Sequence, residues 1–270
     1  MKNWLRLSVL FLAIAVVAGP VLAQEVSFKD PSGDDKGPGN YVYPTDKVYT
    51  AGSFDLTEFK MKVSGEKVDF SVTIGGKLED PWGMGGGFAT QMIFIFLDTD
   101  NKEGSGFTKA LPGLNVAFAP ADAWDKCVIL SPQPQGRVVS EAETKAGWAK
   151  GAVFVPLRTR GAGRTISGSV ALKDLGAGDP AKWGYQVVVQ SNEGFPDKAD
   201  LLTRKVNEFE GQHRFGGGND GDCDPHAMDV LAGKGTGDKS EIEDQKKMLA
   251  YECEADGTAK KAATLSMLRK

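Results

Sequence analysis

Short segments rich in β-branched and aromatic residues recur along the sequence, separated by Gly, Pro, Asp and Asn. Such segments are typical of β-strands, and Ser64-Gly65-Glu66 between two of them predicts a hairpin turn. No stretch between the segments has a convincing helical period. We therefore predict an all-β chain whose two antiparallel sheets pack as a β-sandwich. The seven predicted strands are 54–63, 67–74, 91–97, 126–130, 151–156, 164–171 and 185–190.

The C-terminal segment carries the one predicted helix. Ser240 can cap its start, and Glu243 can return the hydrogen bond as a capping box, so the helix is expected from Ser240 to about Glu252. Its apolar positions are only partly periodic, which places it on the surface of the sandwich. A further strand is expected within 262–268. The predicted organisation is a signal peptide over 1–23, the sandwich over 24–235 and a C-terminal extension, packed on the sandwich, over 236–270.

The N-terminus has the pattern of a secretory signal peptide. Lys2 and Arg6 precede an apolar run over 7–17, and small residues lead to a cleavage point after Ala23. The run is shorter than a membrane span, and no later segment approaches that length. We expect an exported protein, periplasmic, at the cell surface or secreted, without a membrane span after cleavage. The alternative is an uncleaved anchor.

Charge and motifs exclude several functions. The net charge is −4, and no stripe of Lys and Arg alternates with aromatic residues, which argues against nucleic acid as a partner. His213 and His226 are the only histidines, and no nucleophile elbow, zinc-protease or haem-attachment motif occurs. The sequence therefore predicts a non-enzyme. A glycosidase remains the alternative, because paired catalytic carboxylates have no fixed sequence spacing.

The three cysteines differ in their surroundings. Cys127 lies in an apolar strand segment and is expected to be a buried free thiol. Cys223 and Cys253 lie in polar surroundings near the C-terminus, and an exported protein can form disulfides. We predict a Cys223–Cys253 disulfide that ties down the C-terminal segment.

An acidic segment rich in Gly and Pro follows the predicted cleavage point. Its Asp30, Asp34 and Asp35, with Asp55 or Asp46, are predicted ligands of Ca²⁺, which binds six to eight oxygens and tolerates irregular geometry. The alternative is a loop of Asx turns, in which the carboxylates accept hydrogen bonds from their own backbone. Both interpretations fit the residues.

A second acidic loop follows the strand predicted over 91–97. It differs from an EF-hand, since its sixth position is Glu103 where the turn needs Gly and its twelfth is Lys109 instead of Glu. We interpret it as a turn.

A glycine-rich loop carries two aromatic residues, Trp82 and Phe88, beside Asp80. Rings that face outward can stack on the C–H faces of a sugar, and a carboxylate can accept bonds from its hydroxyls. We predict a carbohydrate-binding platform of Trp82, Phe88 and Asp80, with Tyr41 and Tyr43 as further stacking candidates. The alternative is that the rings plug the end of the sandwich core.

Four blocks of the sequence, taken in order, resemble one known family. They are Asp30-Pro31 to Thr45-Asp46, Gly52-Ser53-Phe54-Asp55-Leu56, Pro81-Trp82 to Thr99-Asp100, and Arg214-Phe215-Gly216-Gly217-Gly218 to Met228-Asp229-Val230-Leu231. The chain resembles the C-terminal domain of glucodextranases and amylopullulanases, which is similar to DOMON domains. The resemblance implies a DOMON-like or immunoglobulin-like sandwich in a carbohydrate-related setting. It leads us to expect Trp where this chain has His213.

Three functions follow as hypotheses. The first is an exported, non-catalytic module that binds cell-surface or extracellular polysaccharide. The second is a DOMON-type redox protein with haem b, held by Met84 or Met228 together with His213, His226 or a lysine. The third is a structural component of a surface or envelope complex, whose partners are other envelope proteins.

Overall fold

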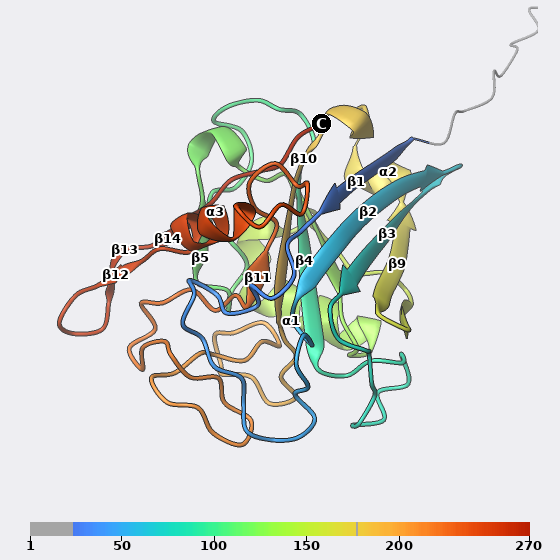
Figure 1. Cartoon of the computed structure of the whole chain (residues 1–270). Helices are drawn as coiled ribbons and strands as arrows, with labels where there is room; N and C mark the ends of the chain where they lie inside the picture. Colours follow the sequence, from blue (N-terminus) through green and yellow to red (C-terminus); the bar gives the residue numbers. More distant parts are fainter. Residues whose placement is uncertain (1–23, 177) are drawn as a thin grey trace, which may run out of the picture.

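A computed structural model describes residues 24–176 and 178–270 (Figure 1), so the predicted signal peptide lies outside the described residues. Two five-stranded sheets pack face to face, which confirms the predicted all-β sandwich. The strands of these sheets are β1 (Glu25–Lys29), β2 (Leu56–Ser64), β3 (Lys67–Ile74), β4 (Gln91–Asp98), β6 (Lys126–Leu130), β7 (Val153–Phe154), β8 (Thr159–Ala162), β9 (Thr165–Ala171), β10 (Gly184–Ser191) and β11 (Asp229–Val230).

The first sheet has the strand order β1-β2-β3-β9-β8, and every neighbouring pair is antiparallel. Burial alternates along its strands: in β3, Val68, Phe70 and Val72 are buried, while the residues between them are partly exposed. One face of this sheet therefore packs on the core and the other faces solvent, as is common in antiparallel sheets.

The second sheet has the order β11-β10-β4-β6-β7 and is buried on both faces. In the central strand β4 every residue is buried. Ile93 and Ile95 join the core between the sheets, whereas Phe94 and Phe96 join a second core on the opposite face. Because both faces are covered, this strand has a continuous apolar sequence, and a third layer must lie beyond it.

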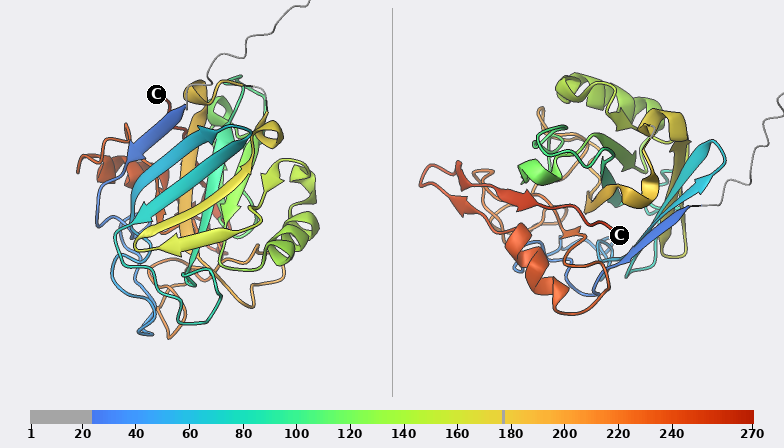
Figure 2. Two further views of the ribbon diagram at one scale, coloured as in Figure 1. Left: turned by 90° about the vertical axis from the view of Figure 1, so that its right-hand side faces the viewer. Right: turned by 90° about the horizontal axis from the view of Figure 1, so that it is seen from above.

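That third layer contains α1 (Gln135–Lys145), β5 (Val116–Phe118) and β14 (Ala263–Leu265), where β5 and β14 are parallel (Figure 2). The expectation that no helix interrupts the strands is wrong, because α1 connects β6 to β7, which pair in parallel. Only Val138 and Ala142 of α1 are buried, so its apolar period was too weak to recognise. A short helix, α2 (Leu172–Leu175), follows β9.

The C-terminal segment packs on the sandwich. Its helix, α3 (Glu241–Met248), ends before the predicted residue, and the capping box is wrong because Asp238 accepts the bonds from the backbone N–H and the hydroxyl of Ser240. β12 (Glu252–Cys253) and β13 (Ala259–Lys261) form a hairpin. β14 confirms the strand expected within 262–268, and the chain then pairs with β10 through two backbone hydrogen bonds between Leu268 and Tyr185.

The predicted cysteine states are confirmed. Cys223 and Cys253 form a disulfide with their Cα atoms 5.5 Å apart, and Cys127 is a buried free cysteine. Within residues 24–176 and 178–270, no helix has the length and apolar character that crossing a membrane requires.

Candidate functional site

Three long connections gather at one end of the sandwich (Figure 1). They follow β1, β3 and β10 and comprise residues 30–55, 75–90 and 192–228. Nearly all of the predicted site residues belong to these connections, so the fold brings them to a common end.

The loop with Trp82 is held in a fixed shape by its own residues. Asp80 accepts hydrogen bonds from the backbone N–H groups of Met84 (2.7 Å) and Gly85 (2.8 Å), so its carboxylate supports the turn. Gly87 has φ +80°, and a Cβ there would lie 2.4 Å from the carbonyl oxygen of Gly161. Trp82 is 36% exposed. The loop thus presents this ring at the surface.

Most of the other predicted stacking rings point inward. The expectation that Phe88 faces outward is wrong: it is 0% exposed and belongs to the core between the sheets. Tyr41 is also buried, and its hydroxyl donates to the carbonyl oxygen of Pro225 (2.7 Å). The half-buried Tyr43 packs edge-on against Phe54. These three rings are part of the fold, which leaves Trp82 as the exposed one.

A cleft of about 360 Å³ lies in the last of the three connections. Phe195, on its rim, is 96% exposed, yet its backbone is anchored. Glu193 accepts a hydrogen bond from the N–H of Phe195 (2.9 Å) and pairs with Arg204 (2.7 Å), and Arg137 donates to the carbonyl of Gly194 (2.5 Å). The fold therefore holds a large apolar ring in solvent beside an ion pair.

The cleft is connected to Trp82 through aromatic contacts. His213 lines the cleft, and its backbone oxygen accepts a bond from Arg204 (2.8 Å). The His213 ring packs against Tyr49 at 5.9 Å between centroids, and Tyr49 packs against Trp82 at 6.3 Å. Aromatic rings therefore run from the exposed Trp82 to the wall of the cleft.

Sequence reasoning missed the cleft residues Phe195, Glu193 and Arg204. One signal was available, because Phe195 is a single aromatic residue beside Gly194 and Pro196 in a polar segment. Trp82 occupies a similar context. The sequence contains no indication of the Glu193–Arg204 pair, because the pair forms only where two segments of the loop meet in space.

The predicted metal ligands divide into two groups. Oxygens of Asp30 and Asp34 lie within 4.8 Å of each other and of Asp229, which the prediction did not include. Asp55 instead accepts bonds from the Ser32 side chain (2.8 Å) and the Gly33 backbone (2.9 Å). The two remaining candidates point elsewhere: Asp35 accepts the hydroxyl of Tyr43, and Asp46 accepts the N–H of Val48.

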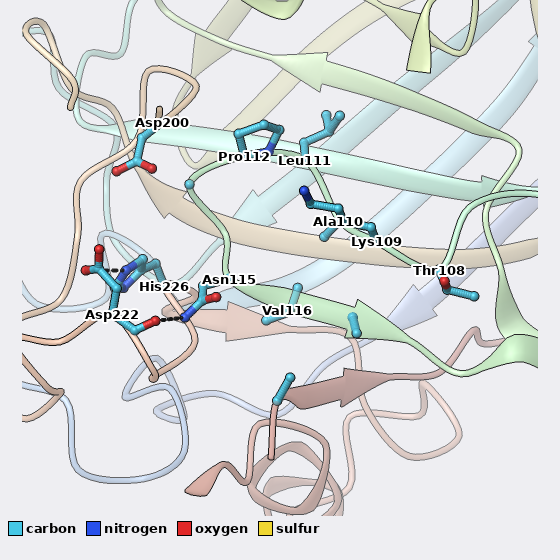
Figure 3. A pocket seen from close by; sticks show the side chains of 13 residues that line it. Thr108, Lys109, Ala110, Leu111, Pro112, Asn115, Val116, Asp200, Asp222 and His226 are labelled. Carbon is cyan, nitrogen blue, oxygen red and sulfur yellow. Dashed lines mark hydrogen bonds and ion pairs between the residues drawn. The ribbon is translucent and has the colours of Figure 1, made fainter. Parts of the chain in front are cut away.

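A second hollow, of about 370 Å³, contains His226 and Asp222 (Figure 3). His226 is buried, its Nδ1 accepts the N–H of Val206 (3.1 Å), and its Nε2 lies 3.6 Å from Asp222. Hydrogen bonds from His226 and Lys205 lower the pKa of Asp222 to about 2. Both ring nitrogens face protein groups, so this histidine stabilises the loop and is not placed as a free general base.

Haem binding by the residues named for it remains a prediction. Met228 packs in the core between the sheets, while Met84 and His213 lie on the surface connections. His226 has the contacts described above.

With two packed sheets and aromatic residues on the loops at one end, the chain is a β-sandwich protein. Within that class, the chain belongs to the family of the glucodextranase C-terminal domain: the family described as the C-terminal, SLH-like binding module of glucodextranase matches residues 26–267. The resemblance found in the sequence is thereby confirmed. A search of curated proteins gave no match. Membership of a binding-module family suggests a carbohydrate-binding domain.

Proposed function

We propose that the chain is an exported, non-catalytic module that binds cell-surface or extracellular polysaccharide at the cleft beside Phe195. The observation that carries the proposal is an almost fully exposed phenyl ring, anchored through its backbone, next to the Glu193–Arg204 pair. The disulfide and the predicted signal peptide support export, because disulfides persist outside the cytosol.

The chemistry of the cleft fits a sugar. An exposed ring can stack on the apolar face of a pyranose, and convergent polar groups can bond its hydroxyls. Phe195 supplies the ring, and Glu193, Arg204 and Asn207 supply acceptors and donors. The exposed Trp82, reached through Tyr49 and His213, offers a second ring for a longer chain of sugars.

Replacing Phe195 with alanine is expected to weaken polysaccharide binding about 10- to 100-fold, which corresponds to losing the burial of one large apolar side chain. Affinity electrophoresis against dextran, pullulan and an anionic cell-wall polysaccharide measures this change. Because the ring is 96% exposed, the melting temperature should stay at the wild-type value.

Trp148→Ala is the matched control. Trp148 is 40% exposed, close to the value for Trp82, but it packs against Phe107 and Trp124 away from the cleft. We expect Trp82→Ala to reduce binding and Trp148→Ala to leave it unchanged. Equal binding by wild type, Phe195→Ala and Trp82→Ala would contradict the proposed site. A wild type that is retarded by no glycan but self-associates would favour the structural-component hypothesis.

A further inference from the structure

Three buried aspartates carry oxygen atoms that have no hydrogen-bond partner among the described residues. These atoms are Oδ2 of Asp30, both carboxylate oxygens of Asp34, and Oδ1 of Asp229. The residues are 5%, 5% and 0% exposed. Leaving buried carboxylate oxygens without a partner is costly, so the arrangement requires a partner such as a proton or a cation.

The fold aims these oxygens at one point. Asp30 follows β1, and its Oδ1 accepts the N–H of Ala232 (3.4 Å). Asp229 lies in β11, and its Oδ2 accepts the N–H of Leu56 at the start of β2 (2.7 Å). In each case one oxygen is fixed by the backbone and the other is left for the cluster. One carboxylate oxygen from each of the three aspartates lies within 4.8 Å of the corresponding oxygens of the other two.

The cluster brings carboxyl groups together without a basic partner. Burial, and then the neighbouring carboxylates, raise the pKa of Asp30 and Asp229 well above the usual range, and burial raises that of Asp34 to about 7. The nearby carboxyl group of Asp55 also raises the pKa of all three. Among the ion pairs of the described residues, none includes any of these four aspartates.

A second acidic cluster shows the contrast. Asp98, Asp100 and Asp125 also approach within 4.8 Å, but the carboxylates bind protein groups. Asp98 pairs with Arg269 (2.5 Å), Asp125 accepts two bonds from Thr99 (2.7 and 3.0 Å), and Asp100 accepts the hydroxyl of Ser105. This cluster is a hydrogen-bonded turn, as the sequence indicated. Proximity of carboxylates therefore does not by itself make a cation site in this protein.

We infer that Asp30, Asp34 and Asp229 bind one Ca²⁺, with Asp34 offering both of its oxygens. Four carboxylate oxygens form a hard, all-oxygen ligand set, which suits Ca²⁺; Zn²⁺ prefers nitrogen and sulfur ligands, and Mg²⁺ demands a regular octahedron and retains several waters. The remaining ligands of the six to eight that Ca²⁺ takes would be backbone carbonyls or water.

Such an ion would join parts of the chain that are distant in sequence. It would bind the first connection, which begins at Asp30, to β11 of the second sheet. The same connection carries Tyr49, the ring beneath Trp82. The inference rests on the aspartates alone and does not depend on the proposed carbohydrate site.

The test compares melting temperatures of chelator-dialysed protein in EGTA and in CaCl₂. Calcium at a concentration of about 100 times its Kd should raise the melting temperature of the wild type by roughly 5–10 °C, because the ion binds only the folded state. Asp34→Asn should abolish this rise. The variant should still fold, since removing one charge from an ion-free cluster relieves repulsion, and circular dichroism checks this. Asp100→Asn, in the hydrogen-bonded cluster, is the matched control and should keep the full rise.

Isothermal titration with CaCl₂ should give one site per chain in the wild type and in Asp100→Asn, and none in Asp34→Asn. A wild-type melting curve that is identical in EGTA and CaCl₂ would overturn the inference and leave the Asx-turn interpretation. An equal calcium response in all three proteins would also overturn it, because the ion would then bind elsewhere. An equal shift with MgCl₂ would overturn the assignment to calcium. None of these outcomes alters the expected effect of Phe195→Ala on retardation by glycans in affinity electrophoresis. This inference and the proposed function can therefore fail separately.

Discussion

Phe88→Ala is expected to lower the free energy of unfolding by about 3–5 kcal/mol, the usual cost of removing a buried aromatic ring. Phe88 is fully buried in the core between the sheets, and the tight backbone approach at Gly87 leaves the loop little room to collapse into the cavity. Urea denaturation followed by tryptophan fluorescence measures the loss. The melting temperature should fall by at least about 6 °C for a chain of this length.

Trp82→Ala, six positions earlier in the same loop, is the internal comparison. Its ring is 36% exposed, and it contacts Tyr49 edge-on, so the variant should lose clearly less stability than Phe88→Ala. A loss at Trp82 as large as that at Phe88 would mean that both rings plug the core, and the platform at Trp82 would have to be abandoned.

Replacing both Cys223 and Cys253 with serine should reduce the free energy of unfolding by about 3–4 kcal/mol, on the chain-entropy account of a 30-residue separation. The bond ties the connection that holds Asp222 and His226 to the β12–β13 hairpin. Denaturation of wild type and variant, each with and without dithiothreitol, measures the effect.

The reductant serves as the control for this variant. Dithiothreitol should bring the wild type to the stability of the double variant and leave the double variant unchanged, because Cys127 is buried and unpaired. A double variant as stable as the oxidised wild type would show that the hairpin folds without its cross-link. In that case the disulfide would have no role in holding the C-terminal segment.

The strands that could be predicted are those whose own sequence shows the pattern. β3 and β6 have the predicted bounds, since both are bounded by turn residues and dense in apolar side chains. β1, β5 and β8 were missed because they are short. The partners of β1 and β5 lie far along the chain, and β8 has no buried residue that would give it an apolar pattern. The third layer was missed for the same reason, although the continuous apolar sequence of β4 is the mark of a strand buried on both faces.

The candidate sites show a similar limit. Asp30 and Asp34 share one acidic segment and were predicted together, whereas Asp229, about 200 residues away, joins them only in the fold. A lone carboxylate inside the apolar run Met228-Asp229-Val230-Leu231 was the available signal. Trp82 and Phe88 have the same kind of loop around them, and their opposite burial depends on packing that the sequence does not display.

The position of the chain ends has a practical consequence for measuring binding. Glu25 begins β1 at the end of the sandwich opposite the three long connections, and Leu268 pairs with β10 at that same end (Figure 1). Attachment to a sensor surface through a tag beyond Lys270 would therefore leave Phe195 and Trp82 facing the bulk solution. Coupling through amines would instead modify exposed lysines such as Lys198, three positions from Phe195, and would obscure the surface to be measured.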